Sequence, residues 1–143
     1  MSAVQISEFL PDEASTLAIG RTLLAYLEGA PLVFLHGQLG AGKTTLVRGI
    51  LRALGHAGAV KSPTYTLLEP YEVEGRTVYH FDLYRIGDSE ELEFIGIDEL
   101  LDADAIKLVE WPERGSTRLP EPDVDIHLSL EGVGRRVEVS VRT

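Results

Sequence analysis

Two apolar segments in the first half of the chain have the patterns of consecutive elements, a buried strand and then an amphipathic helix. Residues 32–35 (LVFL) form an unbroken apolar run after Pro31, which is typical of a parallel strand covered on both faces. Between residues 46 and 54 the apolar residues recur at helical spacing, and Gly55 follows as a helix stop. The pattern predicts a strand and a helix joined by a short loop.

Two further apolar segments predict strands that end at a carboxylate. Residues 78–83 (VYHFDL) contain Asp82 near their end, and residues 105–109 (AIKLV) are followed directly by Glu110. Ligands of α/β sheets gather at the carboxyl ends of parallel strands. We therefore expect the two carboxylates at the same edge of the sheet.

The remaining patterns predict a hairpin and several short helices. Apolar and polar residues alternate over 124–130 and again over 137–141, which predicts a β-hairpin with one face in water. Asp12 is expected to cap a helix that follows an N-terminal lead-in without a predicted element. The acidic residues 88–104 predict one or two short helices broken near Gly96. We interpret this acidic stretch as a solvated face, with a docking surface for a basic partner as the alternative.

The loop between the first strand and its helix carries a phosphate-binding motif. Residues 37–44 (GQLGAGKT) match the pattern G-x-x-x-x-G-K-[ST] at every fixed position. In such a loop the backbone N–H groups bind phosphate oxygens, Lys43 reaches the β- and γ-phosphates, and the Thr44 hydroxyl can bind Mg²⁺. The alternative is a flexible glycine turn that binds nothing, and the flanking strand and helix argue against it.

A P-loop enzyme also needs a carboxylate near Mg²⁺, and Asp82 and Glu110 are the candidates. Either could hold the ion, directly or through water, while the other orients the attacking nucleophile; for each, capping a loop is the structural alternative. We expect an α/β fold of the P-loop NTPase type, with residues 1–143 in one domain. The sheet is expected to be mixed, with a parallel centre, a C-terminal antiparallel hairpin and helices on both faces.

Four other features are weaker candidates for the site. Residues 62–66 (SPTYT) predict a loop whose hydroxyls could sense Mg²⁺ or the γ-phosphate as a switch. Arg85 could neutralise phosphate charge, although a surface ion pair is the default for such a residue. His80 shares the sheet face of Asp82 and is expected to serve in packing or behind the site, since its neighbours are apolar. Trp111 is expected in the core, with adenine stacking or a partner contact as alternatives.

Composition limits the class of protein. Of the residues 44% are hydrophobic and 25% charged, and there is no cysteine, which excludes disulfides and Cys-ligated zinc. No apolar run approaches a membrane span, so we expect a cytoplasmic protein without a membrane partner. The net charge of −10 opposes direct binding to a nucleic-acid backbone. We therefore expect no DNA partner and contact with RNA only through a more basic protein, with acidity for solubility alone as the alternative.

Other activities of P-loop proteins have less support. A GTPase is disfavoured because neither N-K-x-D nor D-x-x-G follows the P-loop. A small-molecule kinase is possible at this length, although such an enzyme needs a lid and an acceptor pocket. A nucleotide-gated binding module, in which hydrolysis is incidental, is the other alternative.

Five segments occur in order along the chain: GQLGAGKTTLVRG, SPTYTLLEPY, YHFDLYR, ELEFIGIDELL and LVEWPERG. Together with LPDEASTLAIG before them and GRRVEVS after them, they resemble the TsaE (YjeE) family of bacterial P-loop ATPases over essentially the whole chain. The resemblance implies an ATPase with ATP and Mg²⁺ as cofactors and weak activity without partners. It implies that the protein works with TsaD and TsaB to form N6-threonylcarbamoyladenosine at position 37 of tRNAs that read ANN codons, and that it meets tRNA through this complex.

The resemblance also implies roles for individual residues. Thr44 and Glu110 would bind Mg²⁺, and Lys43 and Asp82 would be catalytic, with Asp82 near the γ-phosphate or the attacking water. Glu13 in the first helix and Gly134 in the hairpin turn would contact the nucleotide, which the spacing alone does not suggest. The phosphates would be held by Gly40, Ala41, Gly42, Lys43, Thr44 and Thr45.

Overall fold

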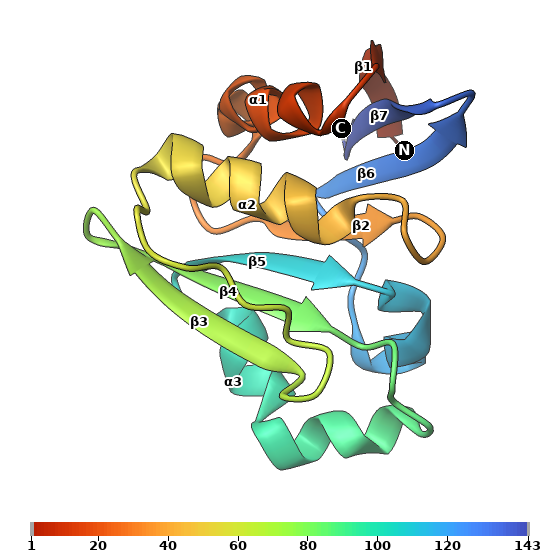
Figure 1. Cartoon of the computed structure of the whole chain (residues 1–143). Helices are drawn as coiled ribbons and strands as arrows, with labels where there is room; N and C mark the ends of the chain where they lie inside the picture. The colour runs from red at the N-terminus through yellow and green to blue at the C-terminus, as the bar shows by residue number, and fades with distance from the viewer. Residues whose placement is uncertain (1, 143) are drawn as a thin grey trace.

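The computed structural model describes residues 2–142, which form one seven-stranded sheet with helices packed against it (Figure 1). The strands lie across the sheet in the order β1-β7-β6-β2-β5-β4-β3. Their bounds are β1 (Ser2–Leu10), β2 (Leu32–His36), β3 (Leu68–Val73), β4 (Arg76–Asp82), β5 (Ala105–Glu110), β6 (Val124–Glu131) and β7 (Gly134–Arg142). The helices are α1 (Glu13–Leu23), α2 (Lys43–Leu54) and α3 (Ile97–Asp102), with 3₁₀ segments η1 (Leu24–Tyr26), η2 (Ser89–Ile95) and η3 (Pro112–Arg118).

The centre of the sheet is parallel and its two edges are antiparallel. Strands β6, β2, β5 and β4 run parallel to one another. At one edge β7 and then β1 add antiparallel strands, and at the other β3 pairs antiparallel with β4. All of β5 is buried, as expected for a parallel strand covered on both faces. The predicted mixed sheet, with a parallel centre and a C-terminal hairpin, is confirmed.

Helices cover both faces of the sheet, as predicted. One core, which includes Ile50, lies between the sheet and the pair α1 and α2. A smaller core, which includes Leu92, lies on the other face under η2, α3 and η3 (Figure 1). Because side chains alternate along a strand, adjacent residues of β5 such as Leu108 and Val109 enter different cores.

The helix boundaries follow the signals in the sequence. Asp12 caps α1, since its Oδ1 accepts a hydrogen bond of 2.9 Å from the backbone N–H of Ser15. Gly55 ends α2 in the left-handed region, at φ +117°. Gly96, at φ +71°, separates η2 from α3, so the predicted break in the acidic stretch is confirmed.

A pair of glycines lets α1 and α2 approach closely. A Cβ on Gly49 would lie 2.4 Å from the carbonyl oxygen of Leu17. A Cβ on Gly20 would lie 2.3 Å from the carbonyl carbon of Gly49. Because these neighbours are backbone atoms that no rotamer change can move, neither position accepts a side chain unless the helices separate.

Replacing Gly49 with alanine is expected to destabilise the protein, although alanine favours helix formation by about 1 kcal/mol. Forcing two packed helices apart costs about 1–3 kcal/mol, which exceeds the gain in helix propensity. We expect a net loss of about 1 kcal/mol in the free energy of unfolding, measured by urea denaturation. Gly58→Ala is the matched control, because a Cβ there meets only the flexible side chain of His56. A stability gain in Gly49→Ala would contradict the close contact.

Two strands were not predicted from the sequence. The expected N-terminal lead-in is instead β1, which pairs with β7 along nearly its whole length. Strand β3 precedes β4 in a hairpin whose turn residues, Glu74 and Gly75, both have positive φ, as in a type I′ turn. Pro70 lies within β3, and it is tolerated because β3 is an edge strand.

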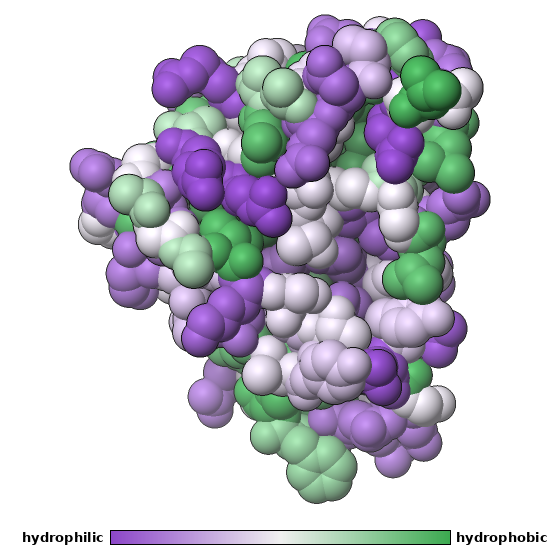
Figure 2. Space-filling view, viewed as in Figure 1, coloured by the Kyte–Doolittle hydropathy of each residue, from purple (hydrophilic) through white to green (hydrophobic). Residues whose placement is uncertain are grey.

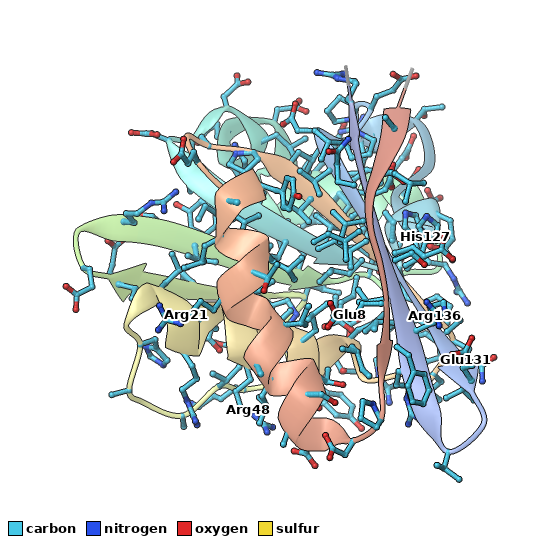
Figure 3. The ribbon with its side chains drawn as sticks, turned by 90° about the horizontal axis from the view of Figure 1, so that it is seen from above. Glu8, Arg21, Arg48, His127, Glu131 and Arg136 are labelled. Carbon is cyan, nitrogen blue, oxygen red and sulfur yellow. The ribbon has the colours of Figure 1, made fainter. Side chains whose placement is uncertain are left out.

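Strand β1 forms the edge of the sheet beside α1. Figure 3 shows β1 alongside β7, with Arg136 near Glu131 in the hairpin. Arg136 donates to the Ser7 hydroxyl of β1 at 3.2 Å and pairs with Glu131 at 2.9 Å. Such exposed pairs stabilise little, so β1 is held mainly by its backbone ladder and by the buried Leu10.

The surface seen from the side of Figure 1 carries its hydrophobic residues in separate groups among hydrophilic ones (Figure 2). Within residues 2–142, no helix is both long and apolar enough to cross a membrane.

Candidate functional site

The P-loop connects the end of β2 to the start of α2, as predicted. Gly40 and Gly42 have φ of +82° and +103°, values that favour glycine, and open space surrounds both. Among residues 2–142, no side chain caps the N-terminus of α2, which begins at Lys43. The first N–H groups of a helix attract anions because they lack partners within the helix and lie at the positive end of its dipole. The loop therefore suits a phosphate group.

Lys43 lies buried at this helix start, with its ammonium group between a backbone carbonyl and an aromatic ring. Its Nζ donates to the carbonyl oxygen of Gly37 and lies 3.8 Å from the centre of the Trp111 ring. Burial lowers the pKa of Lys43, and the negative charges of Glu110 and Asp82 oppose that shift. An ammonium held by one carbonyl and one ring face is suited to move to a stronger anionic partner.

Asp82 and Glu110 lie next to each other, as the strand ends predicted. They are paired residues in the parallel ladder of β4 and β5, and both are buried. Glu110 Oε2 accepts a hydrogen bond of 3.3 Å from the Thr44 hydroxyl. The same oxygen lies 2.6 Å from Nε2 of the buried His80. The structure thus places a hydroxyl and a carboxylate, both oxygen ligands that Mg²⁺ prefers, side by side.

Asp82 is tied to the loop that the sequence predicted as a switch. Its Oδ2 accepts a hydrogen bond of 2.9 Å from the Thr64 hydroxyl, and its Oδ1 accepts one of 3.0 Å from the backbone N–H of Tyr84. The Thr64 hydroxyl also lies 2.8 Å from that of Ser62. Hydrogen bonds therefore connect the Asp82 carboxylate to residues 62–66.

A cavity of about 500 Å³ opens where these groups meet. Its donor set fits a phosphate chain with Mg²⁺, because it combines backbone N–H groups and one ammonium with a hydroxyl and two carboxylates. The lining residues include Gly40, Gly42, Lys43, Thr44, Thr45, Thr64, Asp82, Arg85, Glu110 and Trp111.

A second cavity, of about 230 Å³, lies on the other side of the P-loop. It is lined by Glu13 and Gly134, the two residues that only the family resemblance suggested, and by Ala41. Gly40, Gly42 and Thr45 line both cavities. The fold brings these distant segments together because β1 and β7 carry the start of α1 and the hairpin turn to the P-loop.

Sequence reasoning missed the role of Arg135. Its guanidinium donates to the carbonyl oxygens of Ala41 at 2.9 Å and Gly40 at 3.2 Å. These bonds connect the hairpin to the P-loop and hold two carbonyl groups of the loop. A basic residue directly after the turn glycine was the only signal in the sequence, and it does not specify this contact.

Two expectations for residues near the cavity need correction. Arg85 makes no ion pair within residues 2–142; it lies over the ring of Tyr65 at 4.3 Å and lines the larger cavity. Trp111 was expected in the core but is only half-buried. Trp111 packs against the smaller core, and it also contacts Lys43 and Tyr84.

A second polar cluster lies where β2 and β6 pair, and it consists of His36, Asp125 and His127. Nε2 of His36 lies 2.6 Å from Oδ1 of Asp125, and the two imidazole rings stack at 4.3 Å with 10° between their planes. A metal ion bound to an imidazole lies in the plane of that ring, so one ion cannot occupy two stacked planes. As arranged, the cluster is not a metal centre.

The stability of the protein is expected to fall below about pH 6.5, in part through His127. Partial loss of hydration and the neighbouring His36 lower the pKa of His127, although its side chain is exposed, and Asp125 and Glu138 oppose this only partly. His127 therefore binds a proton more readily in the unfolded chain than in the folded one. Its contribution to the free energy of unfolding is present above the unfolded pKa and is lost as the pH falls. Urea denaturation at pH 7.5 and 5.5 measures this loss of stability. If the stability of His127→Gln depended on pH as that of wild type does, the role of His127 would be contradicted.

The chain is similar to known proteins over most of its length. A family model described as "Threonylcarbamoyl adenosine biosynthesis protein TsaE" matches residues 10–137. The chain is 46% identical to the tRNA threonylcarbamoyladenosine biosynthesis protein TsaE of Haemophilus influenzae, with 96% of this chain and 90% of that protein covered. Identity to the Bacillus subtilis protein of the same name is 35%, with coverage of 88% and 77%. The crystal structure of Bacillus subtilis YdiB is similar over 97% of this chain and 87% of that one, with a TM-score of 0.80 and 26% identity.

Proposed function

The chain belongs to the TsaE family, and on this premise we propose that it binds and hydrolyses ATP with Mg²⁺ in the N6-threonylcarbamoyladenosine modification of tRNA. One observation carries the proposal. The P-loop lysine and threonine share a cavity with two buried carboxylates at adjacent strand ends, Asp82 and Glu110. Phosphoryl transfer needs this set of groups, because its catalysis depends on positioning and on neutralising charge.

Each group has a distinct part in the proposed reaction. Lys43 and the N–H groups at the start of α2 bind the phosphates, and the resemblance assigns Gly40 to Thr45 to this task. Thr44 and Glu110 would hold Mg²⁺, which would neutralise charge on the phosphates. Asp82 holds or deprotonates the attacking water, or orders the Mg²⁺ shell. Glu13 and Gly134, across the P-loop, contact the rest of the nucleotide.

We further propose that the protein works with TsaD and TsaB and meets tRNA through them. The net charge of −10 supports this arrangement, because an acidic protein is repelled by a nucleic-acid backbone. Leu39 lines the larger cavity and Tyr65 packs on its lining residue Arg85. Their side chains are 69% and 81% exposed, and a partner could cover them. Since the tRNA is modified in the bacterial cytoplasm, we place the protein there.

ATP turnover with and without TsaB–TsaD tests the proposal. We expect weak hydrolysis by the protein alone, at least about tenfold faster hydrolysis with the partners, and formation of modified tRNA over many turnovers only while ATP is hydrolysed. If the γ-phosphate were transferred to a small acceptor without partner proteins, the activity would be that of a metabolite kinase. If partners left turnover unchanged, the partner proposal would be wrong.

Nucleotide binding is expected to change the fluorescence of Trp111, the single tryptophan of the chain. The Lys43 ammonium now lies against its ring, and bound phosphate would attract that charge away. A titration of ADP with Mg²⁺, followed by emission, measures the change, and Lys43→Ala should remove most of it. Unchanged emission at an ADP concentration that calorimetry shows to be saturating would contradict this movement.

A further inference from the structure

His80 is a buried histidine that packing alone does not explain. Its ring is fully enclosed, and its Nε2 lies 2.6 Å from Oε2 of Glu110. In the described part of the chain, its other nitrogen, Nδ1, has no hydrogen-bond partner. A buried polar atom without a partner weakens a fold, so an apolar side chain would suit this core position better. We therefore expect the role of this histidine to lie in its hydrogen bond with the Glu110 carboxylate.

The state of the ring follows from that contact. An ionised carboxylate can only accept hydrogen bonds, so Nε2 of His80 carries the hydrogen and donates it to Glu110. The structure thus favours the tautomer with its hydrogen on Nε2, which leaves Nδ1 as an acceptor without a partner among residues 2–142.

The contact fixes how the Glu110 carboxylate faces the larger cavity. Oε2 accepts from two donors, His80 at 2.6 Å and the Thr44 hydroxyl at 3.3 Å. No residue among 2–142 donates to Oε1, and Glu110 lines the cavity. A carboxylate held by two donors on one oxygen has little freedom to rotate, so its other oxygen remains available to a ligand in the cavity.

We propose that His80 is a positioning residue for the cation site: it orients Glu110 so that the free oxygen and the Thr44 hydroxyl can bind one divalent ion together. The inference rests on the proposed function, because it assumes that Glu110 and Thr44 are the Mg²⁺ ligands. Hydrogen-bond partners of metal ligands typically change metal affinity by about 10- to 100-fold when they are removed. His80 should therefore act on the metal and leave metal-free nucleotide binding nearly unchanged.

Four forms of the full-length protein test this role. His80→Leu removes the donor at similar volume, and His80→Gln keeps an N–H donor at a similar reach. Val78→Ala is the packing control, because Val78 is buried in β4 on the same sheet face and contacts neither carboxylate. For each variant and the wild type, ADP affinity is measured by calorimetry in EDTA and across a MgCl₂ series. Thermal unfolding confirms that each variant is folded.

We expect His80→Leu to need about 10- to 100-fold more Mg²⁺ for half of the metal-dependent gain in ADP affinity. Its affinity in EDTA should stay within about threefold of wild type, and His80→Gln should recover most of the metal response. The positioning role is wrong if His80→Leu keeps the wild-type Mg²⁺ response, or if Val78→Ala changes that response equally. A wild-type protein that binds no ADP, or shows no Mg²⁺ effect, would instead overturn the proposed function.

A second measurement is independent of any nucleotide. ¹⁵N NMR of the imidazole nitrogens in the nucleotide-free protein reports which nitrogen of His80 carries hydrogen. We expect hydrogen on Nε2 and a bare Nδ1, with the Nε2–H signal altered in Glu110→Ala. Hydrogen on Nδ1 alone would contradict the contact on which the positioning role depends.

Discussion

Lys43→Ala is expected to abolish ATP hydrolysis and to weaken nucleotide binding by about 100-fold, or about 2.8 kcal/mol. The reason is that Lys43 is the one ammonium group among the residues that line the larger cavity. Hydrogen bonds from a charged donor to phosphate contribute about 1.5–3 kcal/mol each. Calorimetry with ADP and Mg²⁺ measures the affinity, and phosphate release in the presence of TsaB–TsaD measures hydrolysis.

Lys61→Ala is the matched control for this substitution. It also removes one lysine charge, but Lys61 is exposed in the loop before residues 62–66 and lines neither cavity. We expect its nucleotide affinity to stay within about twofold of wild type, since exposed charges interact weakly through water. If Lys43→Ala sustained many rounds of tRNA modification as well as wild type, ATP hydrolysis at this site would not drive the process.

Asp82→Asn should separate nucleotide binding from hydrolysis. Asparagine keeps an acceptor for the Tyr84 N–H and a group that can meet the Thr64 hydroxyl, so the loop is expected to stay in place. The lost negative charge removes general-base or water-positioning ability, which contributes about 10²- to 10⁴-fold in rate. We expect kcat to fall by that factor while ATP affinity changes less than about threefold. Single-turnover hydrolysis with partner proteins measures the effect.

Thr64→Val distinguishes chemistry from loop ordering at Asp82. It removes the hydroxyl that donates to Asp82 at 2.9 Å and leaves the carboxylate intact. A much smaller loss of kcat than in Asp82→Asn would support a direct role for the carboxylate. An equal loss would assign the effect to the loop. If Asp82→Asn still supported repeated tRNA modification, the protein would be a nucleotide-gated binding module, and hydrolysis would be incidental.

The sequence predicted those parts of the site that depend on local pattern. The P-loop is fixed by its glycines and by the strand and helix beside it, so its position follows from a short segment. Asp82 and Glu110 could be expected together because both end parallel strands, and the structure pairs them directly. The parallel centre of the sheet follows from unbroken apolar runs, which only strands covered on both faces can accommodate.

The features that could not be predicted from the sequence depend on which segments meet in space. Because strand β1 was not predicted, there was no physical reason to expect Glu13 and Gly134 at the same cavity. His80 was expected in packing or behind the site because its neighbours in the sequence are apolar, which does not identify Glu110 as its partner. Neighbours in a strand point to the opposite face, however, so they say nothing about the surroundings of His80. The contacts of Arg135 with the P-loop could not be predicted, since 94 and 95 positions separate the partners.

The contact between Arg135 and the P-loop also bears on the order of folding during synthesis. A ribosome releases the P-loop and α2 long before the hairpin of β6 and β7, because chains emerge from the N-terminus. Strand β1 gains its neighbour only when β7 arrives, and contacts so distant in sequence form late. The nascent chain therefore lacks the Arg135 contacts of its P-loop until its last strand is made. We expect the proposed ATP binding to be acquired at the end of folding, so that a prematurely terminated chain competes poorly with the finished protein for nucleotide.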